Sequence, residues 1–178
     1  MNAKFTDIVS VIRKRYGHEG PIPLHAPFFG GNEKKYLEQC IDTTYVSSVG
    51  PFVNRFESMM ADLTGSNFAV ATVNGTSALH TALLIAGVNS NDEVISQALT
   101  FVATANAISY IGASPIFIDV DKFTLGMCPR ALENYLRNET FMNSSDECIN
   151  KITGKRIRAC VPMHTFGLVS DVESILEI

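Results

Sequence analysis

The chain has 178 residues, of which 46% are hydrophobic, enough for the core of one ordinary globular domain. Its formal net charge is −4, from 14 basic and 18 acidic residues, so we expect no surface for nucleic acid or an anionic membrane. Charged and apolar residues alternate through residues 1–16, which therefore lack the apolar stretch of a signal peptide or a membrane span. These features predict a soluble, cytoplasmic protein.

The cysteines and histidines are scattered along the chain. The cysteines form no CxxC pair, and a chain of this size does not need disulfides, so we expect reduced, structural thiols at Cys40, Cys128, Cys148 and Cys160. No HExxH motif or i, i+4 pair occurs among His18, His25, His80 and His164. A protein metal site is therefore not expected.

Residues 1–65 form an N-terminal helical segment. Apolar residues at helical spacing predict helices over residues 5–16, 32–44 and 52–64, with Asn32 as an N-cap and Gly65 as a C-terminal cap. The second and third helices are joined by a turn-rich loop, residues 47–51. The third helix carries an aromatic and methionine stripe that we expect to be core: Phe52, Phe56, Met59, Met60 and Leu63.

Residues 66–178 show short apolar runs that alternate with helical stretches, which is typical of successive βα units and a mostly parallel sheet. Strands are predicted over residues 68–73, 93–96, 116–120 and 158–163. Two of the helices that follow them cover residues 77–86 and 101–110 and are closed by Gly87 and Gly112, and the other two begin at Pro129 and Ser170. The polar residues 138–155 are expected to form a surface excursion with a small hairpin around residues 153–154.

The last predicted helix begins with a capping box, in which Ser170 bonds the amide of Glu173 and the Glu173 carboxylate reaches back. Its apolar residues Val172, Ile175 and Leu176 have nothing downstream in this chain to pack against. We therefore expect the chain to be the N-terminal part of a longer protein. A naturally short protein that ends in a docked helix is the alternative.

The strongest local signal for chemistry is residues 69–79 (AVATVNGTSAL): an apolar strand, a polar turn with a glycine, and an immediate helix start. Free amides at a helix N-terminus, with the hydroxyls of Thr76 and Ser77, suit a phosphate. The segment is neither a P-loop nor a GxGxxG fingerprint. Taken alone, it fits simple helix capping equally well.

Two further signals lie at the predicted carboxyl ends of strands, where parallel sheets bind ligands. Phe101, in residues 97–104 (QALTFVAT), could stack on a flat ring, or it could be an ordinary core residue at a helix start. His164, in residues 162–167 (PMHTFG), could meet a cofactor or substrate, or it could be a satisfied buried histidine.

Taken in order, these segments resemble the DegT/StrS-type sugar aminotransferases, which are fold-type I enzymes that use pyridoxal phosphate (PLP). The resemblance covers residues 22–178 and is carried by residues 47–53 (SSVGPFV), 74–79 (NGTSAL), 92–95 (DEVI), 100–104 (TFVAT), 112–121 (GASPIFIDVD) and 164–167 (HTFG). Residues 23–27, 31–37 and 45–50 look most like the legionaminic-acid-pathway (LegC-like) branch. The family implies a three-layer α/β large domain with helices on both faces of the sheet, and paired sites across a homodimer interface.

The resemblance also implies roles for single residues. Gly75, Thr76 and Ser77 would hold the PLP phosphate, Phe101 would stack on the pyridine ring, and His164 would lie at the cofactor. Ser47 and Ser48 would lie near the substrate. The implied reaction moves an amino group, with glutamate as the expected donor, to a nucleotide-linked 4-keto-6-deoxy sugar for surface-glycan or nonulosonic-acid biosynthesis.

Two groups that the family's chemistry needs are missing from residues 1–178: the Schiff-base lysine and the aspartate that keeps the pyridine nitrogen protonated. In the family both follow the "HxxG" segment, so we expect this chain alone to be inactive. A PLP-dependent sugar dehydratase, with histidine in place of that lysine, and a non-catalytic remnant are the alternatives. We also expect the chain alone to self-associate, because its sheet would have an unpaired edge and uncovered helix faces.

Overall fold

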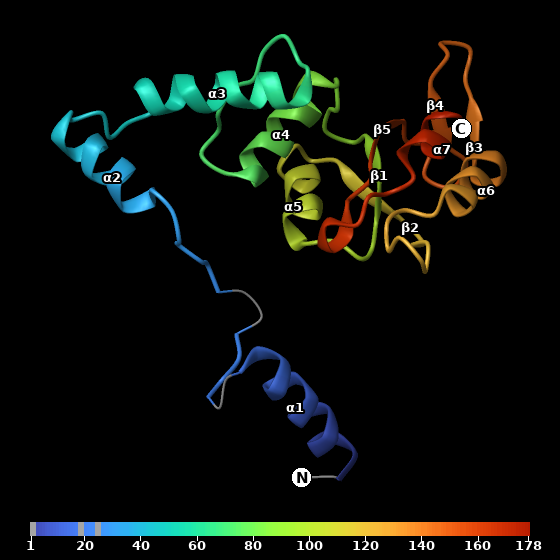
Figure 1. Ribbon diagram of the computed structural model, residues 1–178. Helices are drawn as coiled ribbons and strands as arrows, with labels where there is room; N and C mark the ends of the chain where they lie inside the picture. The colour runs from blue at the N-terminus through green and yellow to red at the C-terminus, as the bar shows by residue number, and fades with distance from the viewer. Residues whose placement is uncertain (1–2, 18–19, 24–25) are drawn as a thin grey trace. The chain divides into compact units, whose positions relative to one another are not determined.

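The computed structural model describes residues 3–17, 20–23 and 26–178, and it divides the chain into two compact units, Met1–Phe56 and Glu57–Ile178. His18, His25 and residue 24 of the LegC-like segment lie outside the described residues. Figure 1 shows the helices and strands with the labels used below.

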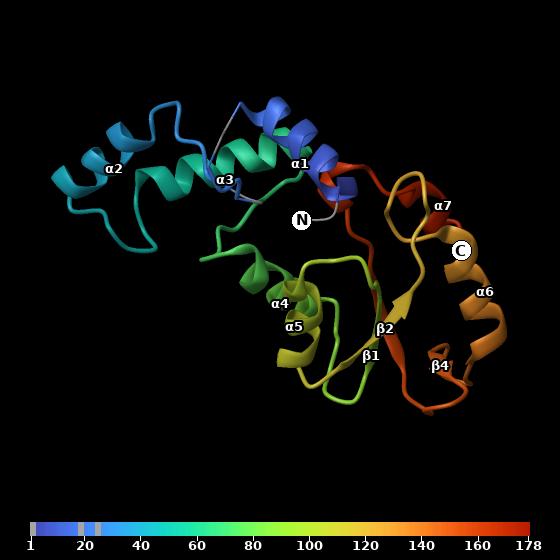
Figure 2. The same ribbon diagram turned by 90° about the horizontal axis from the view of Figure 1, so that it is seen from below.

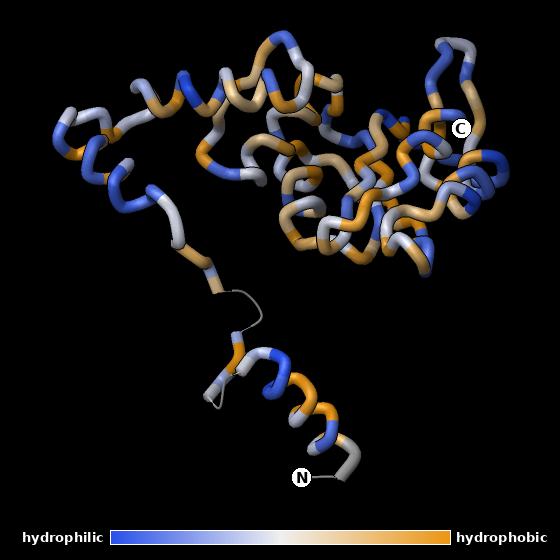
Figure 3. The backbone as a smooth tube through the Cα atoms, viewed as in Figure 1, coloured by the Kyte–Doolittle hydropathy of each residue, from blue (hydrophilic) through white to orange (hydrophobic). Residues whose placement is uncertain are grey.

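The N-terminal unit is helical, as the sequence predicts. It contains α1 (Ala3–Tyr16), α2 (Glu33–Asp42) and the beginning of α3 (Pro51–Thr64), which continues into the second unit. Asn32 occupies the N-cap of α2, but its side chain makes no capping hydrogen bond; Glu33 Oε2 instead accepts from the amide of Gly31 at 2.9 Å. Hydrophobic and hydrophilic residues alternate along α1 in Figure 3.

The apolar stripe of α3 is not core, so this expectation is wrong. Phe56, Met59 and Leu63 are 53%, 57% and 80% exposed, and no residue of the helix is buried. An apolar helix face is buried only where a second layer covers it, and among the described residues no element buries this face of α3. The C-terminus of α3 does end as predicted, since Gly65 has φ +68° and the amide of Ser66 donates to the carbonyl of Ala61.

The second unit is built on a three-stranded parallel sheet, which confirms the predicted fold class. Its strands are β1 (Glu93–Gln97), β2 (Ser114–Ile118) and β5 (Ile157–Val161), in the order β2-β1-β5. In the central strand, Ile95 pairs with Ile116 on one side and Cys160 on the other. All five residues of β1 are buried, as expected of a central parallel strand.

Helices cover both faces of this sheet and give the unit three layers (Figures 1 and 2). On one face α4 (Gly75–Ile85) and α5 (Val102–Tyr110) pack against Val94; on the other, α6 (Pro129–Glu139) and α7 (Val172–Leu176) pack against Ile95. Successive residues of a strand point to opposite faces, so Val94 and Ile95 belong to different cores. The first core contains Leu83, Val88, Val94, Ala107, Ile108 and Ala113; the second contains Ile95, Ile118, Met127 and Leu132.

Residues 68–73 are not a strand, which corrects the predicted count of four parallel strands to three. The segment is irregular, and Phe68, Val70 and Val73 are 86%, 82% and 88% exposed. A strand needs a neighbour for its backbone hydrogen bonds, and no strand among the described residues lies beside this one. The amide of Ala71 donates to Glu57 Oε1 at 2.8 Å, which anchors the segment to α3.

The polar excursion forms a small antiparallel hairpin from β3 (Thr140–Met142) and β4 (Cys148–Asn150). The expected turn around residues 153–154 is present directly after it. The amide of Asn150 donates to the carbonyl of Lys155 at 2.9 Å, and Ile149 bridges Arg156. The chain therefore reverses direction twice before it enters β5.

The predicted capping box at the last helix is wrong. Asp171 is the N-cap of α7, and its side chain accepts from the amide of Ser174 at 3.1 Å. Ser170 lies one residue earlier and is 2% exposed, and its Oγ donates to the carbonyl of Met163 at 2.7 Å. Aspartate and serine are equally good caps, and here the serine hydroxyl is already used in a buried contact.

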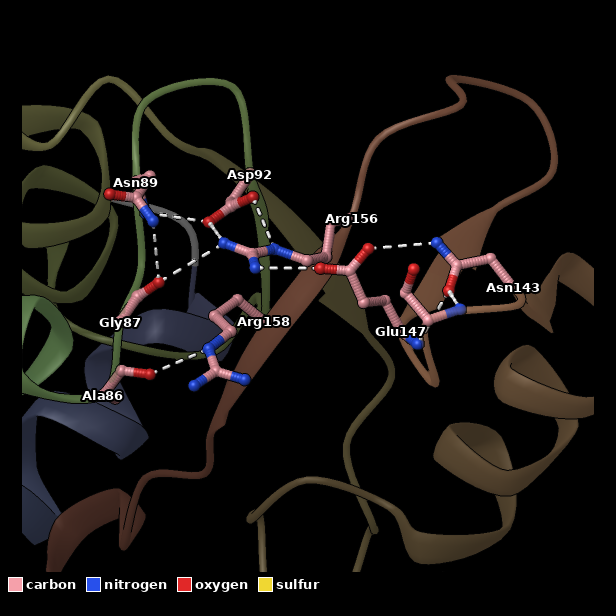
Figure 4. Close-up of polar contacts among 9 residues, drawn as sticks. Ala86, Gly87, Asn89, Asp92, Asn143, Glu147, Arg156 and Arg158 are labelled. Carbon is pink, nitrogen blue, oxygen red and sulfur yellow. Dashed lines mark hydrogen bonds and ion pairs between the residues drawn. The ribbon is translucent and has the colours of Figure 1, made fainter.

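At the amino ends of the strands, Arg156 links three segments (Figure 4). It donates to both carboxylate oxygens of Asp92, at 3.0 and 2.7 Å, and to Glu147 Oε1 in the hairpin at 3.1 Å. Burial alone would raise the pKa of Asp92, but the hydrogen bonds from Arg156 and from the amide of Asn89 outweigh it and hold that pKa below its ordinary value. Arg156 thus fastens the hairpin and the α4–β1 loop to the start of β5.

Candidate functional site

The start of α4 is a helix N-terminus that is capped from outside its first turn. Asn74 has extended backbone angles, and its Oδ1 accepts from the amide of Ser77 at 2.8 Å. Gly75, Thr76 and Ser77 form the first helical turn, whose remaining amides have no acceptor within the helix. A Cβ added at Gly75 would have no neighbouring atom within 4 Å, so the space beside this turn is open.

The hydroxyls of Thr76 and Ser77 take no part in this cap. Neither side chain makes a hydrogen bond to any residue in the described part of the chain, and both residues are half-buried. The capping interpretation therefore applies to Asn74 and leaves the two hydroxyls unexplained. Two hydroxyls and free amides at the positive end of a helix form a donor set for an anion such as a phosphate.

Phe101 is not a core residue. It occupies the N-cap position of α5 in an extended conformation, and its side chain is 73% exposed. The exposed ring immediately precedes the first turn of a helix that packs against α4. Such a ring is available to stack on a planar ligand.

The connectivity places these two helix starts at the same end of the sheet. The helix α4 leads into the amino end of β1, and α5 starts from the carboxyl end of the same strand. Because α4 packs on the sheet and ends at the short loop into the amino end of β1, it runs antiparallel to that strand, and its first turn lies at the carboxyl end together with that of α5. Open α/β sheets bind ligands at this end. No hydrogen bond or ring contact joins residues 75–77 to Phe101 among the residues the structure describes.

His164 follows β5 at this end and is exposed, so it is not the buried histidine of the alternative interpretation. Its Nδ1 lies 3.0 Å from the amide nitrogen of Ser170, which donates to it. A ring nitrogen that accepts a hydrogen bond carries no proton, and this bond assigns the proton of the neutral ring to Nε2. His164 thus presents an N–H donor from the end of the sheet.

Gln97 and Thr165 are polar residues of this region that the sequence analysis did not single out. Gln97 is the last residue of β1 and is 0% exposed; Thr165 is 2% exposed. The Gln97 amide nitrogen donates to Thr165 Oγ1 at 2.9 Å, and its Oε1 accepts from the amide of Met163 at 3.1 Å. The available signal was a glutamine directly after the strand predicted over residues 93–96, because a buried side-chain amide needs several partners.

The loop after β2 completes the carboxyl end of the sheet. Asp121 accepts from the amides of Thr124 and Phe123, and these hydrogen bonds lower the pKa of its carboxyl. The loop then reaches Leu125, whose φ is +57°, and Gly126. A Cβ at Gly126 would lie 3.0 Å from the Cα of Ser170, so only glycine allows this close approach to the segment after β5.

Ser47 and Ser48 lie in the N-terminal unit, and both are exposed. Ser47 lines a hollow of about 380 Å³ formed by the α2–α3 loop and the facing ends of the two helices, whereas Ser48 does not. Within this unit the ring centroids of Tyr36 and Phe52 are 5.0 Å apart and brace α2 against α3. The two serines are therefore on a loop with an adjacent hollow.

A second hollow, of about 970 Å³, lies on the α6 and α7 face of the sheet and is lined by Ile95, Ala159 and Leu136 among others. None of the predicted site residues lines it. This hollow lies where α6 and α7 leave part of the sheet uncovered, on the opposite face of the sheet from α4 and α5. The polar donors described above make the carboxyl end of the sheet the better candidate.

The described residues contain no cluster of three or more histidine, cysteine or acidic side chains that could hold a metal ion. All four cysteines are free. No helix in the same residues is both long and apolar enough to cross a membrane.

A three-layer α/β unit that has a helix start with free donors and an exposed aromatic ring at the carboxyl end of its sheet is typical of enzymes that bind a phosphorylated small molecule. The comparison with known proteins identifies the family. Residues 28–178 match the DegT/DnrJ/EryC1/StrS aminotransferase family, and the chain belongs to it.

Individual relatives agree with this assignment. The chain is 38% identical to the GDP-perosamine synthase of Caulobacter vibrioides and 33% identical to EpsN of Bacillus subtilis, described as a putative pyridoxal phosphate-dependent aminotransferase. Each match covers 157 residues, 88% of this chain and 38% of the relative. An aminotransferase from Psychrobacter cryohalolentis has the same fold, with a TM-score of 0.69 at 26% identity over 87% of this chain and 35% of that one. The chain therefore spans well under half the length of these relatives.

Proposed function

We propose that the full-length protein is a PLP-dependent aminotransferase that transfers an amino group to a nucleotide-linked keto sugar. The observation that carries the proposal is the pair of helix starts at the carboxyl end of the sheet: the Asn74-capped turn with two unbonded hydroxyls, and the exposed ring of Phe101. Family membership adds the reaction class. The relative described as pyridoxal phosphate-dependent adds the cofactor.

The residues present fit a phosphorylated ring. The amides of Gly75 and Thr76 and the hydroxyls of Thr76 and Ser77 would bind the phosphate, because these donors have no partner within the first turn and lie at the positive end of the helix dipole, whereas the amide of Ser77 is capped by Asn74. Phe101 would cover one face of the ring. His164 would donate from Nε2 to an acceptor on the cofactor or the substrate.

PLP, when bound, supplies an electron sink that stabilises negative charge on the carbon that loses a proton. The residues of this chain would anchor and orient it, and they would leave the proton transfer to a lysine outside residues 1–178. The aspartate that pairs with the ring nitrogen would also lie outside this range. A chain that ends at residue 178 would then bind the phosphate weakly and transfer no amino group.

For the substrate we propose a nucleotide-linked 4-keto-6-deoxy sugar, with glutamate as the amino donor. The support is the match to a relative named for a GDP-linked product. The loop with Ser47 and Ser48 would contact this substrate, in a homodimer that builds paired sites, and the resemblance of residues 31–37 and 45–50 favours the LegC-like branch. Surface-glycan or nonulosonic-acid biosynthesis in the cytoplasm is the corresponding role.

The test is amino transfer by the purified full-length protein. With PLP, glutamate and a panel of nucleotide-linked 4-keto-6-deoxy sugars, mass spectrometry should detect an aminated nucleotide sugar and equimolar 2-oxoglutarate. A Phe101→Ala variant should retain its fold by circular dichroism and lose most of this activity. Loss of water from the sugar without amination would favour a dehydratase, and no reaction with any of the sugars would refute the proposal.

A further inference from the structure

The side chain of Gln97 connects the loops that follow all three strands of the parallel sheet. Its Nε2 lies 3.0 Å from the carbonyl of Leu99, which follows β1, and 3.1 Å from the carbonyl of Leu125, which follows β2. It also donates to Thr165 Oγ1 at 2.9 Å, and its Oε1 accepts from the amide of Met163 at 3.1 Å; both residues follow β5. One buried amide therefore holds together the whole carboxyl end of the sheet.

The protons in this cluster match its acceptors. The Gln97 amide has two N–H groups and Thr165 has one hydroxyl proton, which serve Leu99 O, Thr165 Oγ1 and Leu125 O. The Thr165 hydroxyl donates to Leu125 O at 2.8 Å, so the longer contact from Gln97 is not needed to satisfy that carbonyl. A fully satisfied buried network fixes one arrangement, and the loss of one member leaves the others without partners.

Two of the three loops, those after β2 and β5, need such a restraint because each contains a strained residue. Leu125 has φ +57° and Phe166 has φ +55°, left-handed conformations that are unfavourable for a non-glycine residue. Leu125 offers its carbonyl to the Gln97–Thr165 pair, and Phe166 directly follows Thr165. The buried amide thus bonds the carbonyl of Leu125 directly and the side chain of Thr165, the neighbour of Phe166.

The same cluster determines where His164 and Phe101 lie. Met163, bonded through its amide to Gln97, also accepts from Ser170 Oγ at 2.7 Å, and the amide of Ser170 donates to His164 Nδ1. On the other side, the carbonyl of Leu99 is held two residues before the exposed ring of Phe101. We infer that Gln97 is a positioning residue, which sets the separation of Phe101 and His164 and keeps the His164 proton on Nε2. The inference rests on the proposed function for the identity of the ligand, PLP.

Three substitutions in the full-length protein test this role. Gln97→Met keeps the length of the side chain and removes every hydrogen bond. Gln97→Glu keeps the acceptor for Met163 and loses the donors until the carboxyl is protonated. Ser96→Ala is the matched control: Ser96 is the preceding residue of β1, also 0% exposed, and its Oγ donates to the carbonyl of Val161 at 2.9 Å inside the sheet.

Hydrogen exchange tests the restraint itself. In Gln97→Met the amides of Met163 and Ser170 should exchange about tenfold faster or more, as expected for the loss of one buried hydrogen bond, while Ser96→Ala leaves them unchanged. The ¹⁵N spectrum of His164 should show the Nε2–H tautomer in the wild type and a mixture in Gln97→Met. Unchanged exchange at Met163 and an unchanged His164 spectrum would overturn the inference.

Cofactor affinity tests its consequence. Gln97→Met should weaken PLP binding about tenfold or more, and Ser96→Ala by less than about twofold. As the pH is lowered, the PLP affinity of Gln97→Glu should approach that of the wild type at the same pH, because a protonated glutamate side chain can donate a hydrogen bond again. Thr165→Val should act like Gln97→Met, and Thr165→Ser should behave like the wild type, which covers the case in which Gln97→Met does not fold.

Equal losses of affinity in Gln97→Met and Ser96→Ala would show that Gln97 acts only through general stability and would overturn the inference. A wild-type protein that does not bind PLP would instead refute the proposed function. The exchange rates at Met163 and Ser170 would still decide whether Gln97 restrains the loops.

Discussion

Replacing Asn74 with aspartate separates the two tasks of the α4 turn. The Asn74 side chain caps the helix by accepting from Ser77 at 2.8 Å, and aspartate is an equally good N-cap. A carboxylate at a helix N-terminus is also favoured by the helix dipole. Asn74→Asp should therefore leave the stability of the protein unchanged or slightly raise it. If the turn holds a phosphate, the new charge stands beside an anion.

The size of the effect follows from this geometry. The carboxylate caps the amide of Ser77 in the same turn whose other donors would hold the phosphate, so the two anions would lie about 6 Å apart. A phosphate monoester carries nearly two negative charges at neutral pH, and at effective dielectric constants of roughly 40–80 the repulsion is about 1–3 kcal/mol. The dissociation constant of PLP should rise about 5- to 150-fold.

The assay is a PLP titration of the full-length protein, followed by absorbance, beside a thermal unfolding scan without the cofactor. Asn134→Asp on α6 is the matched control, because Asn134 Oδ1 accepts from Asn138, and the substitution keeps that acceptor while it adds the same charge to the opposite layer. We expect Asn74→Asp to bind PLP more weakly than the wild type without losing thermal stability, and we expect Asn134→Asp to bind PLP as the wild type does. Equal PLP affinity in Asn74→Asp and the wild type would refute the phosphate assignment.

Three further predictions concern other parts of the chain. Phe101→Leu should change the unfolding free energy by less than about 0.5 kcal/mol, because the ring is 73% exposed, but weaken PLP binding roughly tenfold through lost stacking; equal binding would exclude Phe101 from the site. Asp92→Asn should lower the midpoint of thermal unfolding by a few degrees at pH 7. Since the folded-state pKa of Asp92 lies below its ordinary value of 3.8, this stabilisation is present above pH 3.8 and is lost as the pH falls through the lower folded value; a difference that does not shrink as the pH falls below 3.8 would contradict it. The 178-residue chain alone should self-associate in light scattering, since Leu63, Phe68 and Val70 are among many exposed apolar residues; a monodisperse monomer would contradict this.

The elements predicted best are those that local signals define. Pro129 begins α6, Gly87 and Gly112 follow α4 and α5 with φ of +82° and +85°, and the buried run of β1 lies within one residue of its predicted position. These features depend on single residues and on the apolar period, which the sequence displays directly.

The errors occur where a tertiary partner decides. Residues 68–73 have the composition of a strand but no neighbouring strand, and the stripe of α3 has the period of a core helix but no covering layer. Ser170 fits an N-cap, yet the Met163 carbonyl takes its hydroxyl and Asp171 becomes the cap. Local pattern cannot determine which of two adjacent capping residues finds another partner.

The residues of the candidate site divide in the same way, into those with a local signal in the sequence and those without one. Thr76, Ser77 and Phe101 stand next to a glycine turn or a helix start, which are local signals. Gln97 acts on residues 28, 66 and 68 positions away, and nothing in its immediate sequence indicates those contacts. Residues whose role is to join distant loops become visible only when the loops are placed in space.

A structure of the full-length protein with PLP tests the central claim most directly. The claim predicts the phosphate about 3 Å from the amides of Gly75 and Thr76 and from the hydroxyls of Thr76 and Ser77, with the Phe101 ring stacked on the pyridine. PLP bound elsewhere, or residues 75–77 and Phe101 facing away from each other, would contradict it.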